Sequence, residues 1–200
     1  LELDPSLSRT HVNFGALLWK QDRHAAAVEH YEQAIALDPD FADAYVHLGQ
    51  AMQFLGRVNE ALRCGEMAVH LDPSSAKAHL NFGRALQARG SIENAIPYYR
   101  KAIALNGRLA EAYKSYAYAG PVADEDPLRD NLSAALARRD LDDSERACLH
   151  YAAGKMESDR SRHGAAFEHW TKGAYLRRKG INYASEKSRK NFTAYKSVFN

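Results

Sequence analysis

Cysteine and long apolar runs are both scarce in this 200-residue sequence. The two cysteines, Cys64 and Cys148, stand far apart and lack the spacing of a metal site, so we expect two reduced, partly buried thiols in a cytoplasmic protein. No apolar run reaches the length of a membrane span and no signal peptide is recognisable, so we expect no membrane partner. The apolar fraction of 46% is ordinary for a globular chain and excludes a disordered one.

Motifs that carry catalysis are missing as well. The sequence contains no glycine-rich phosphate loop, no nucleophile elbow and no Ser/His/Asp order, and its histidines lack the spacing of a helical zinc site. We therefore predict no catalytic, cofactor-binding or metal-binding residue, no cofactor, and no enzymatic activity in this chain. His11, His79 and His150 recur at one position of a repeat described below, which predicts that they fill a core.

Charge is nearly balanced, at a net +2, but it is unevenly distributed. Residues 160–200 carry ten Lys or Arg against two acids, a net +8, and residues 1–159 carry a net −6. Such asymmetry can indicate nucleic-acid binding. However, Arg177, Arg178 and Lys179 close a predicted helix, where cations are favoured, and no recognition motif accompanies them. We expect no nucleic-acid partner.

What the sequence does contain is a repeat with an interval of 34 residues. The stretch ADAYVHLGQAMQFLGRVNEALRCGEMAVHLDPSS, residues 42–75, recurs with drift on both sides. Small residues recur where helices approach closely, large apolar ones where a core is filled, and proline where a helix stops. The matched sets are Tyr45, Leu48, Gly49, Ala61, Ala68 and Pro73; His11, Phe14, Gly15, Ala27, Ala34 and Pro39; and His79, Phe82, Gly83, Ala95, Ala102 and Gly107.

This pattern resembles the tetratricopeptide repeat (TPR), a helix–turn–helix unit of that length. The resemblance implies an all-α, right-handed α-solenoid, because neither helix of a unit can bury its apolar face alone and the units must stack. Three regular units are expected at 8–41, 42–75 and 76–109. Residues 1–5 match the end of a repeat, so we expect that the chain begins inside one.

Local signals refine these units. We expect helices near 8–21 and 24–37, near 58–71, and near 76–89 and 92–105, with Ser8 or Thr10 capping the first. Pro97 should kink its helix or delay its start. Gly15, Gly49 and Gly83 lie in mid-helix at a cost of roughly 1 kcal/mol each, which close packing within a pair would explain. Gly65 stands where the neighbouring units have tyrosine, so we expect looser packing there or a neighbour leaning in.

After residue 109 the pattern loosens. Residues 110–143 read as a degenerate fourth pair, with Tyr113 and Tyr116 in core positions, a long loop at 120–126 and a helix near 127–138. Residues 144–200 read as a fifth pair, with helices near 144–158 and 164–178, followed by an amphipathic capping helix near 184–198. Asp142, Asp143 or Ser144 would cap the first of these.

In a stacked array the first helix of each pair lines the concave surface. We predict a peptide-binding groove there, built from Asn13, His47, Gln50, Asn81, Arg84, Ser115 and Tyr118. An asparagine both donates and accepts hydrogen bonds, so Asn13 and Asn81 could pair with an extended peptide backbone. They resemble two rungs of the asparagine ladder in TPR arrays of glycosyltransferases; solvated surface residues are the alternative interpretation.

Residues 144–200 also resemble the segment that precedes the catalytic domain of bacterial TPR-containing sulfotransferases. The resemblance rests on Leu149-His150-Tyr151, Gly154-Lys155, Ala166-Phe167, Gly173, Arg177-Arg178 and Tyr183. It implies a non-catalytic, partner-binding region with a sulfotransferase domain following in cis. The alternative is a freestanding adaptor that binds a protein or an extended peptide in its groove.

Overall fold

The computed structural model describes residues 5–179, and every regular element in that part of the chain is an α-helix. The ten helices are α1 (Pro5–Lys20), α2 (His24–Leu37), α3 (Ala42–Phe54), α4 (Val58–Leu71), α5 (Ala76–Ala88), α6 (Ile92–Leu105), α7 (Ala110–Ala119), α8 (Leu128–Leu136), α9 (Asp143–Asp159) and α10 (His163–Lys179). The predicted all-α class is confirmed. The capping helix expected near 184–198 lies outside the described residues.

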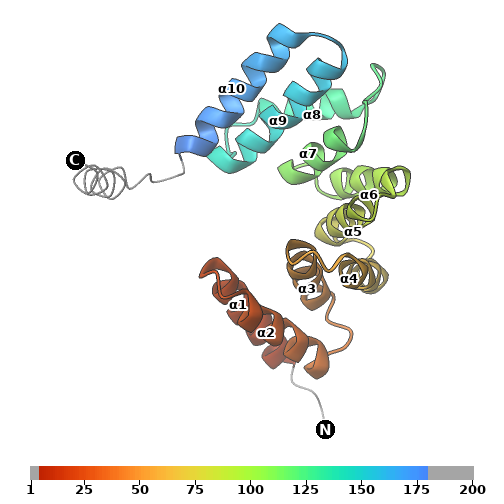
Figure 1. Ribbon diagram of the computed structural model, residues 1–200, viewed down its shortest axis with the longest axis vertical. Helices are drawn as coiled ribbons and strands as arrows, with labels where there is room; N and C mark the ends of the chain where they lie inside the picture. Colours follow the sequence, from red (N-terminus) through yellow and green to blue (C-terminus); the bar gives the residue numbers. More distant parts are fainter. Residues whose placement is uncertain (1–4, 180–200) are drawn as a thin grey trace, which may run out of the picture.

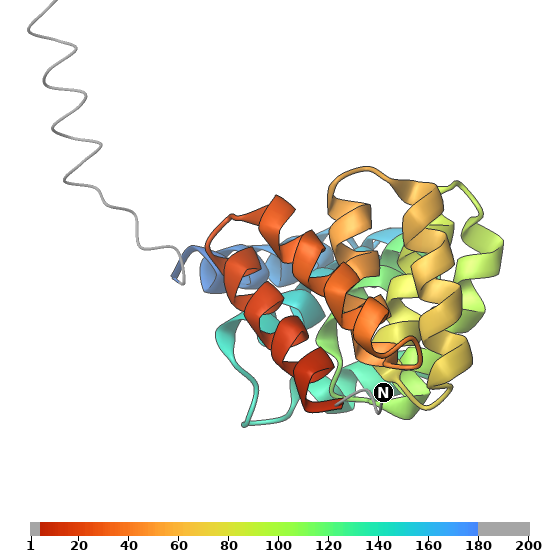
Figure 2. The ribbon, with the colours of Figure 1, turned by 90° about the horizontal axis from the view of Figure 1, so that it is seen from below.

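The helices stack as an α-solenoid. α1 packs against α2, α3 against α4, α5 against α6, and α9 against α10, and each pair rests on the next. The stack curves, with α3, α5 and α7 toward the open side and α4 and α6 on the outer side (Figure 1). Viewed from below, successive pairs turn relative to one another instead of lying in a flat row (Figure 2). The curvature creates the concave surface on which a binding site can form.

A main apolar core runs through the stack and contains most of the recurring positions, and a small second cluster is formed by Val46, Ala68 and Ala78. Ala27, Ala61 and Ala95 are each at most 2% exposed, and the aromatic rings of Tyr31 and Tyr99 are equally well covered. The alanines let the two backbones of a pair approach, and the rings of Tyr31 and Tyr99 pack against Gly15 and Gly83 on the first helix of their own pair. The tight turns at Gly56 and Gly90 have φ angles of +74° and +89°, a conformation that glycine adopts without strain.

The mid-helix glycines are explained by close packing, as predicted. A β-carbon on Gly15 would lie 2.6 Å from Cε1 of Tyr31, and one on Gly49 would lie 3.2 Å from Cβ of Cys64. At Gly65 the neighbour leans in: Phe82 of the next pair packs so close that a β-carbon would lie 2.9 Å from its Cα. The packing at Gly65 is therefore tight, and the looser alternative is wrong.

One prediction about a helix start is wrong, and for Pro97 one of the two expected effects is excluded. Neither Ser8 nor Thr10 caps α1, because the helix begins a turn earlier at Pro5; Ser8 is fully buried, and Thr10 donates its hydroxyl proton to the Ser6 carbonyl, 2.7 Å away. Pro97 does not delay α6, which begins at Ile92 as its neighbours predict. Proline removes one helical N–H, and both Pro97 and Glu93 lie on the exposed side of the helix.

The second half departs from regular stacking. α7 packs mainly against α9, and the short α8 contacts both only slightly. Between α7 and α8, the 120–126 loop is held in place by Asp126, whose carboxylate accepts hydrogen bonds from Tyr116 Oη at 2.5 Å and Arg100 Nη2 at 2.6 Å.

Asp142, one of the three residues predicted to cap α9, does so in a reciprocal capping box with Glu145. Leu128 and Leu132 of α8 are buried, and Leu136 is half-buried.

Candidate functional site

The concave surface contains three adjoining hollows lined mainly by the first helix of each pair. The largest, about 620 Å³, lies between α1 and α3 and reaches Arg84 and Glu111. A second, about 380 Å³, lies between α3, α5 and the start of α9, and shares His47, Gln50 and Glu111 with the first. A third, about 540 Å³, shares Gln53 and Arg84 with the first and extends to Tyr118. Together they form one groove along the inner face.

Six of the seven residues predicted for the groove lie in these hollows, namely His47, Gln50, Asn81, Arg84, Ser115 and Tyr118. Asn13 does not: it is exposed on α1 and lines none of them. The repeat register places two columns of residues on the inner face of α3, α5 and α7. At α1 one of the two columns continues, because Ala16, one interval before Gln50, lines the largest hollow together with Trp19 and Lys20. The other column stops there, because Asn13, one interval before His47, lines none of the hollows.

Asn81 is engaged within the protein. Its amide donates to the Val46 carbonyl at 3.2 Å, and its oxygen accepts from Gln50 Nε2 at 3.3 Å. With 5% of its surface exposed, Asn81 joins α3 to α5 rather than standing free at the surface. An incoming peptide would therefore meet Gln50 before it met Asn81.

Arg84 joins α5 to α7 in a similar way. Its Nε donates to Ser115 Oγ at 3.1 Å, and its guanidinium lies 3.0 Å from the Glu111 carboxylate. Glu111 thus neutralises Arg84 in the middle of the groove. The two bonds also fix the guanidinium plane, so that Arg84 presents an ordered edge to the groove.

His47 is half-buried beside these groups and stacks on Tyr31, with ring centroids 5.4 Å apart. Burial lowers the pKa of His47; Lys77 acts in the same direction and Asp43 opposes it. The imidazole is therefore neutral at physiological pH and can both donate and accept a hydrogen bond in the groove.

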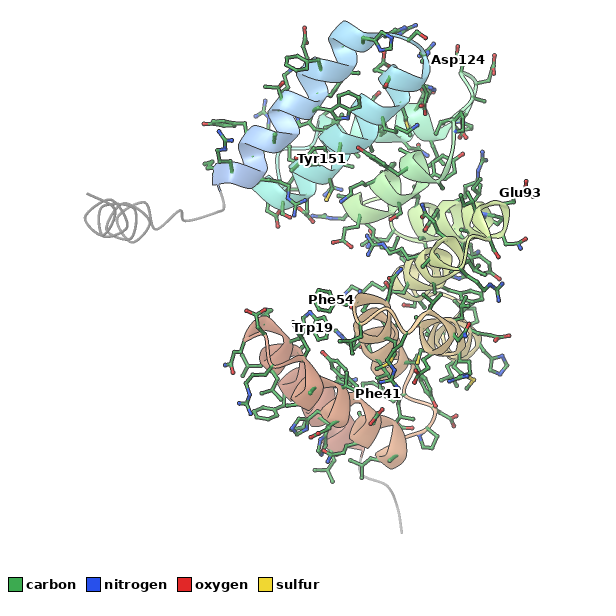
Figure 3. The ribbon with its side chains drawn as sticks, in the orientation of Figure 1. Trp19, Phe41, Phe54, Glu93, Asp124 and Tyr151 are labelled. Atoms are coloured by element: carbon green, nitrogen blue, oxygen red, sulfur yellow. The ribbon has the colours of Figure 1, made fainter. Side chains whose placement is uncertain are left out.

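An aromatic cluster at the mouth of the largest hollow was not identified from the sequence. Trp19, His24 and Phe54 lie within 4.3–5.2 Å of one another, measured between ring centroids. Figure 3 shows Trp19 and Phe54 pointing toward each other on the open side of the stack. One sequence signal could have revealed the cluster: the next repeats carry Gln53 and Gln87 where the first has Trp19.

The histidines at the repeated position are only partly the core residues that were predicted. His79 is 7% exposed and lies 3.0 Å from the Pro73 carbonyl through Nε2. His11 and His150 are half-buried, and each faces a second histidine nineteen residues further on, with Nδ1–Nδ1 distances of 2.9 Å to His30 and 3.0 Å to His169. The equal spacing of nineteen residues in both pairs could have indicated these histidine contacts from the sequence.

Other chemistry is not indicated in the described part of the chain. Within residues 5–179, no three His, Cys, Asp or Glu side chains come together in a group that could hold a metal ion. None of the helices described there is both long and apolar enough to cross a membrane.

Comparison with known proteins agrees with the stacked repeats. Residues 20–56 match the family described as "TPR repeat", and residues 76–109 match "Tetratricopeptide repeat". No curated protein matches the sequence. Two segments of the chain, residues 20–56 and 76–109, therefore match the tetratricopeptide repeat.

Three solved structures illustrate the shared fold. A mutant O-GlcNAc transferase from Thermobaculum terrenum is 24% identical with a TM-score of 0.57; the match covers 66% of this chain but only a quarter (25%) of that one. The first TPR of Spaghetti (RPAP3), bound to the HSP90 peptide SRMEEVD, is 22% identical with a TM-score of 0.56, over 60% of this chain and 94% of that one. YrrB, described as a TPR protein with an unusual peptide-binding site, is 24% identical with a TM-score of 0.54, over 90% of each chain.

Proposed function

We propose that this chain is a binding scaffold whose concave groove holds an extended peptide or an extended segment of a partner protein. The observation that carries the proposal is the continuity of the three hollows across α1, α3, α5 and α7, with His47, Gln50 and Arg84 along them. Extended peptides fit long, shallow grooves that offer backbone partners at intervals, whereas small molecules favour enclosed pockets.

Two of the similar structures support this proposal through their printed descriptions. Spaghetti is described with a bound peptide, and YrrB with a peptide-binding site. At 22–24% identity these likenesses establish the fold, and the transfer of peptide binding to this chain belongs to the proposal.

The groove differs from a carboxylate clamp, which needs converging cations for a terminal carboxylate. Here the Glu111 carboxylate already forms an ion pair with the Arg84 guanidinium, and the Asp43 carboxylate lies near His47. We therefore propose that the groove binds an internal segment of a partner and not a chain terminus.

Selection from a random peptide display library tests the proposal. Hydrogen–deuterium exchange of the complex with a selected synthetic peptide should show added protection in α3 and α5, on their inner faces. Protection confined to α4 and α6 would place binding on the outer surface and contradict the groove. Failure to enrich any peptide above an unrelated control protein would contradict peptide binding itself.

The wider context of the scaffold is a second proposal. The likeness of residues 144–200 to the segment preceding bacterial sulfotransferase domains supports a role as the partner-binding part of such an enzyme, in the cytoplasm. A freestanding adaptor is the alternative. The gene sequence following Asn200 distinguishes them, because a sulfotransferase requires a phosphosulfate-binding loop within a few dozen residues.

A further inference from the structure

The aromatic cluster at the groove mouth is not required by the repeat. Phe54 is 65% exposed, although Val46, Leu48 and Met52 on the same helix are buried. Lys20 and Ala88 take the place of Phe54 in the neighbouring repeats, and glutamine takes the place of Trp19. Repeat packing therefore does not explain the exposed ring of Phe54 on the open face, whereas the half-buried Trp19 also packs against the core.

The hollow beside these rings is largely apolar on one side. Ala16, Trp19, Ala51 and Phe54 line it together with the ring of Tyr31, and its volume of about 620 Å³ is ample for one large side chain. The exposed ring of Phe54 beside the half-buried Trp19, next to a preformed apolar hollow, has the usual form of an anchor site, because burying a ring there releases water from both surfaces.

The polar surroundings of the hollow favour a particular charge. Across the first and third hollows the lining cations are Lys20, Arg84 and Lys114, and the lining carboxylate is Glu111. Arg84 is paired with Glu111. Lys20 and Lys114 enter none of the ion pairs formed among residues 5–179, so two positive charges remain uncompensated on either side of Arg84.

Building on the proposed function, we infer that the groove selects acidic peptides carrying one large apolar side chain. That side chain lies against Trp19 and Phe54, and the peptide carboxylates face Lys20 and Lys114. Gln53, which lines both hollows, and Gln50, which lines the hollow of Lys20, offer amide groups to the peptide backbone. The apolar anchor supplies affinity, and the charges set orientation and association rate.

Peptides selected from the random library test this inference. We expect enrichment of one Phe, Trp, Leu or Ile together with Asp or Glu. Phe54→Ala should weaken binding of a selected synthetic peptide at least about tenfold. Phe167→Ala is the matched control, because Phe167 is 69% exposed and lines none of the three hollows, and it should leave affinity unchanged. Circular dichroism would verify that both variants fold.

Charge reversal tests the role of the two lysines in selecting acidic peptides. Lys20→Glu and Lys114→Glu should each weaken binding by about threefold or more at low salt, with the effect reduced by added salt. Lys101→Glu, on the exposed side of α6, should leave affinity unchanged.

The outcomes separate the two proposals. Peptides that bind in the groove but lack a large apolar side chain would overturn this inference and leave the proposed function intact. The same holds for peptides whose affinity is unchanged by Phe54→Ala. Selected peptides rich in Lys or Arg would likewise overturn it. If no peptide is enriched, the proposed function fails and this inference fails with it.

Discussion

Gly83 lies directly beneath the ring of Tyr99, where a β-carbon on the glycine would be 2.7 Å from Cε1 of the tyrosine. The relationship recurs between Gly15 and Tyr31 at 2.6 Å, and between Gly154 and Trp170 at 2.5 Å. Each pair joins the first helix of a unit to its second. Glycine is favoured at each site because a ring from the second helix fills the space that a side chain would take.

Gly83→Ala should therefore destabilise the protein. Tyr99 is fully buried and donates its hydroxyl proton to Gln87 at 2.6 Å, so the ring cannot swing aside without losing that bond. We expect a loss of about 1–3 kcal/mol, in the range of overpacked cores, measured by urea denaturation. Gly164→Ala is the control: nothing lies within 4 Å of its position, and alanine should be neutral or slightly stabilising. Equal effects at the two sites would contradict the close-packing explanation.

Asp126→Ala should loosen the 120–126 loop. The Asp126 side chain is 3% exposed; it pairs with Arg100, accepts from Tyr116, and accepts from the Leu128 N–H at 3.0 Å. Its removal leaves the buried Tyr116 hydroxyl and the start of α8 without their acceptor, at a cost of about 2–3 kcal/mol. Limited proteolysis should cut the loop faster in the variant. In Glu125→Ala, at the exposed neighbouring residue, the loop should be cleaved at the wild-type rate. A similar increase in cleavage there would show that the effect is not specific to Asp126.

Acid should weaken the contact between α9 and α10. Burial, together with the smaller effects of His169, Lys172 and Arg146, lowers the pKa of His150 to about 4. Burial and Lys172 also lower the pKa of His169, against Glu157 and Glu168. The folded form thus binds fewer protons than the unfolded form, so the pair's contribution is complete above the ordinary histidine pKa of about 6.5 and is lost as the pH falls from there toward 4.

His150→Tyr tests this pH dependence. Tyrosine occupies the same repeat position at Tyr45 and Tyr113, so the variant should fold. Between about pH 6.5 and 4 its stability should fall less than that of the wild type, by on the order of 1–2 kcal/mol. His163→Tyr, at an exposed site, should follow the wild-type curve. Identical curves for all three proteins would show that the pair does not titrate in this range.

Cys64 should react slowly with thiol reagents. Burial, together with a smaller effect of Glu60, raises the pKa of Cys64 to about 11, so the reactive thiolate is rare at neutral pH. We expect alkylation by iodoacetamide on the order of 100-fold slower than for a free cysteine, followed by mass spectrometry. In urea both cysteines should react at the ordinary rate. Rapid labelling of Cys64 in the folded protein would mean that α4 opens more readily than its packing indicates.

The 34-residue interval determined which segments form helices and which residues enter the core, because burial of one helical face constrains residue type at fixed spacing. Repeat register also identified the inner faces of α3, α5 and α7, since equivalent residues lie at equivalent places in a stack. Gly65 shows the limit of this reasoning: the sequence indicated an irregular contact but left two alternatives, and only the position of Phe82 decided between them.

The sequence by itself determined a stack of helix pairs with a concave surface, because the helices can bury their repeated apolar faces only against one another. Tertiary structure alone decided what that surface offers to a ligand. Asn81 is used internally, α9 packs on α7, and Trp19 and Phe54 meet across two repeats. Each of these contacts joins residues from different helices, and the angle between successive pairs, which no local pattern encodes, sets which side chains can meet.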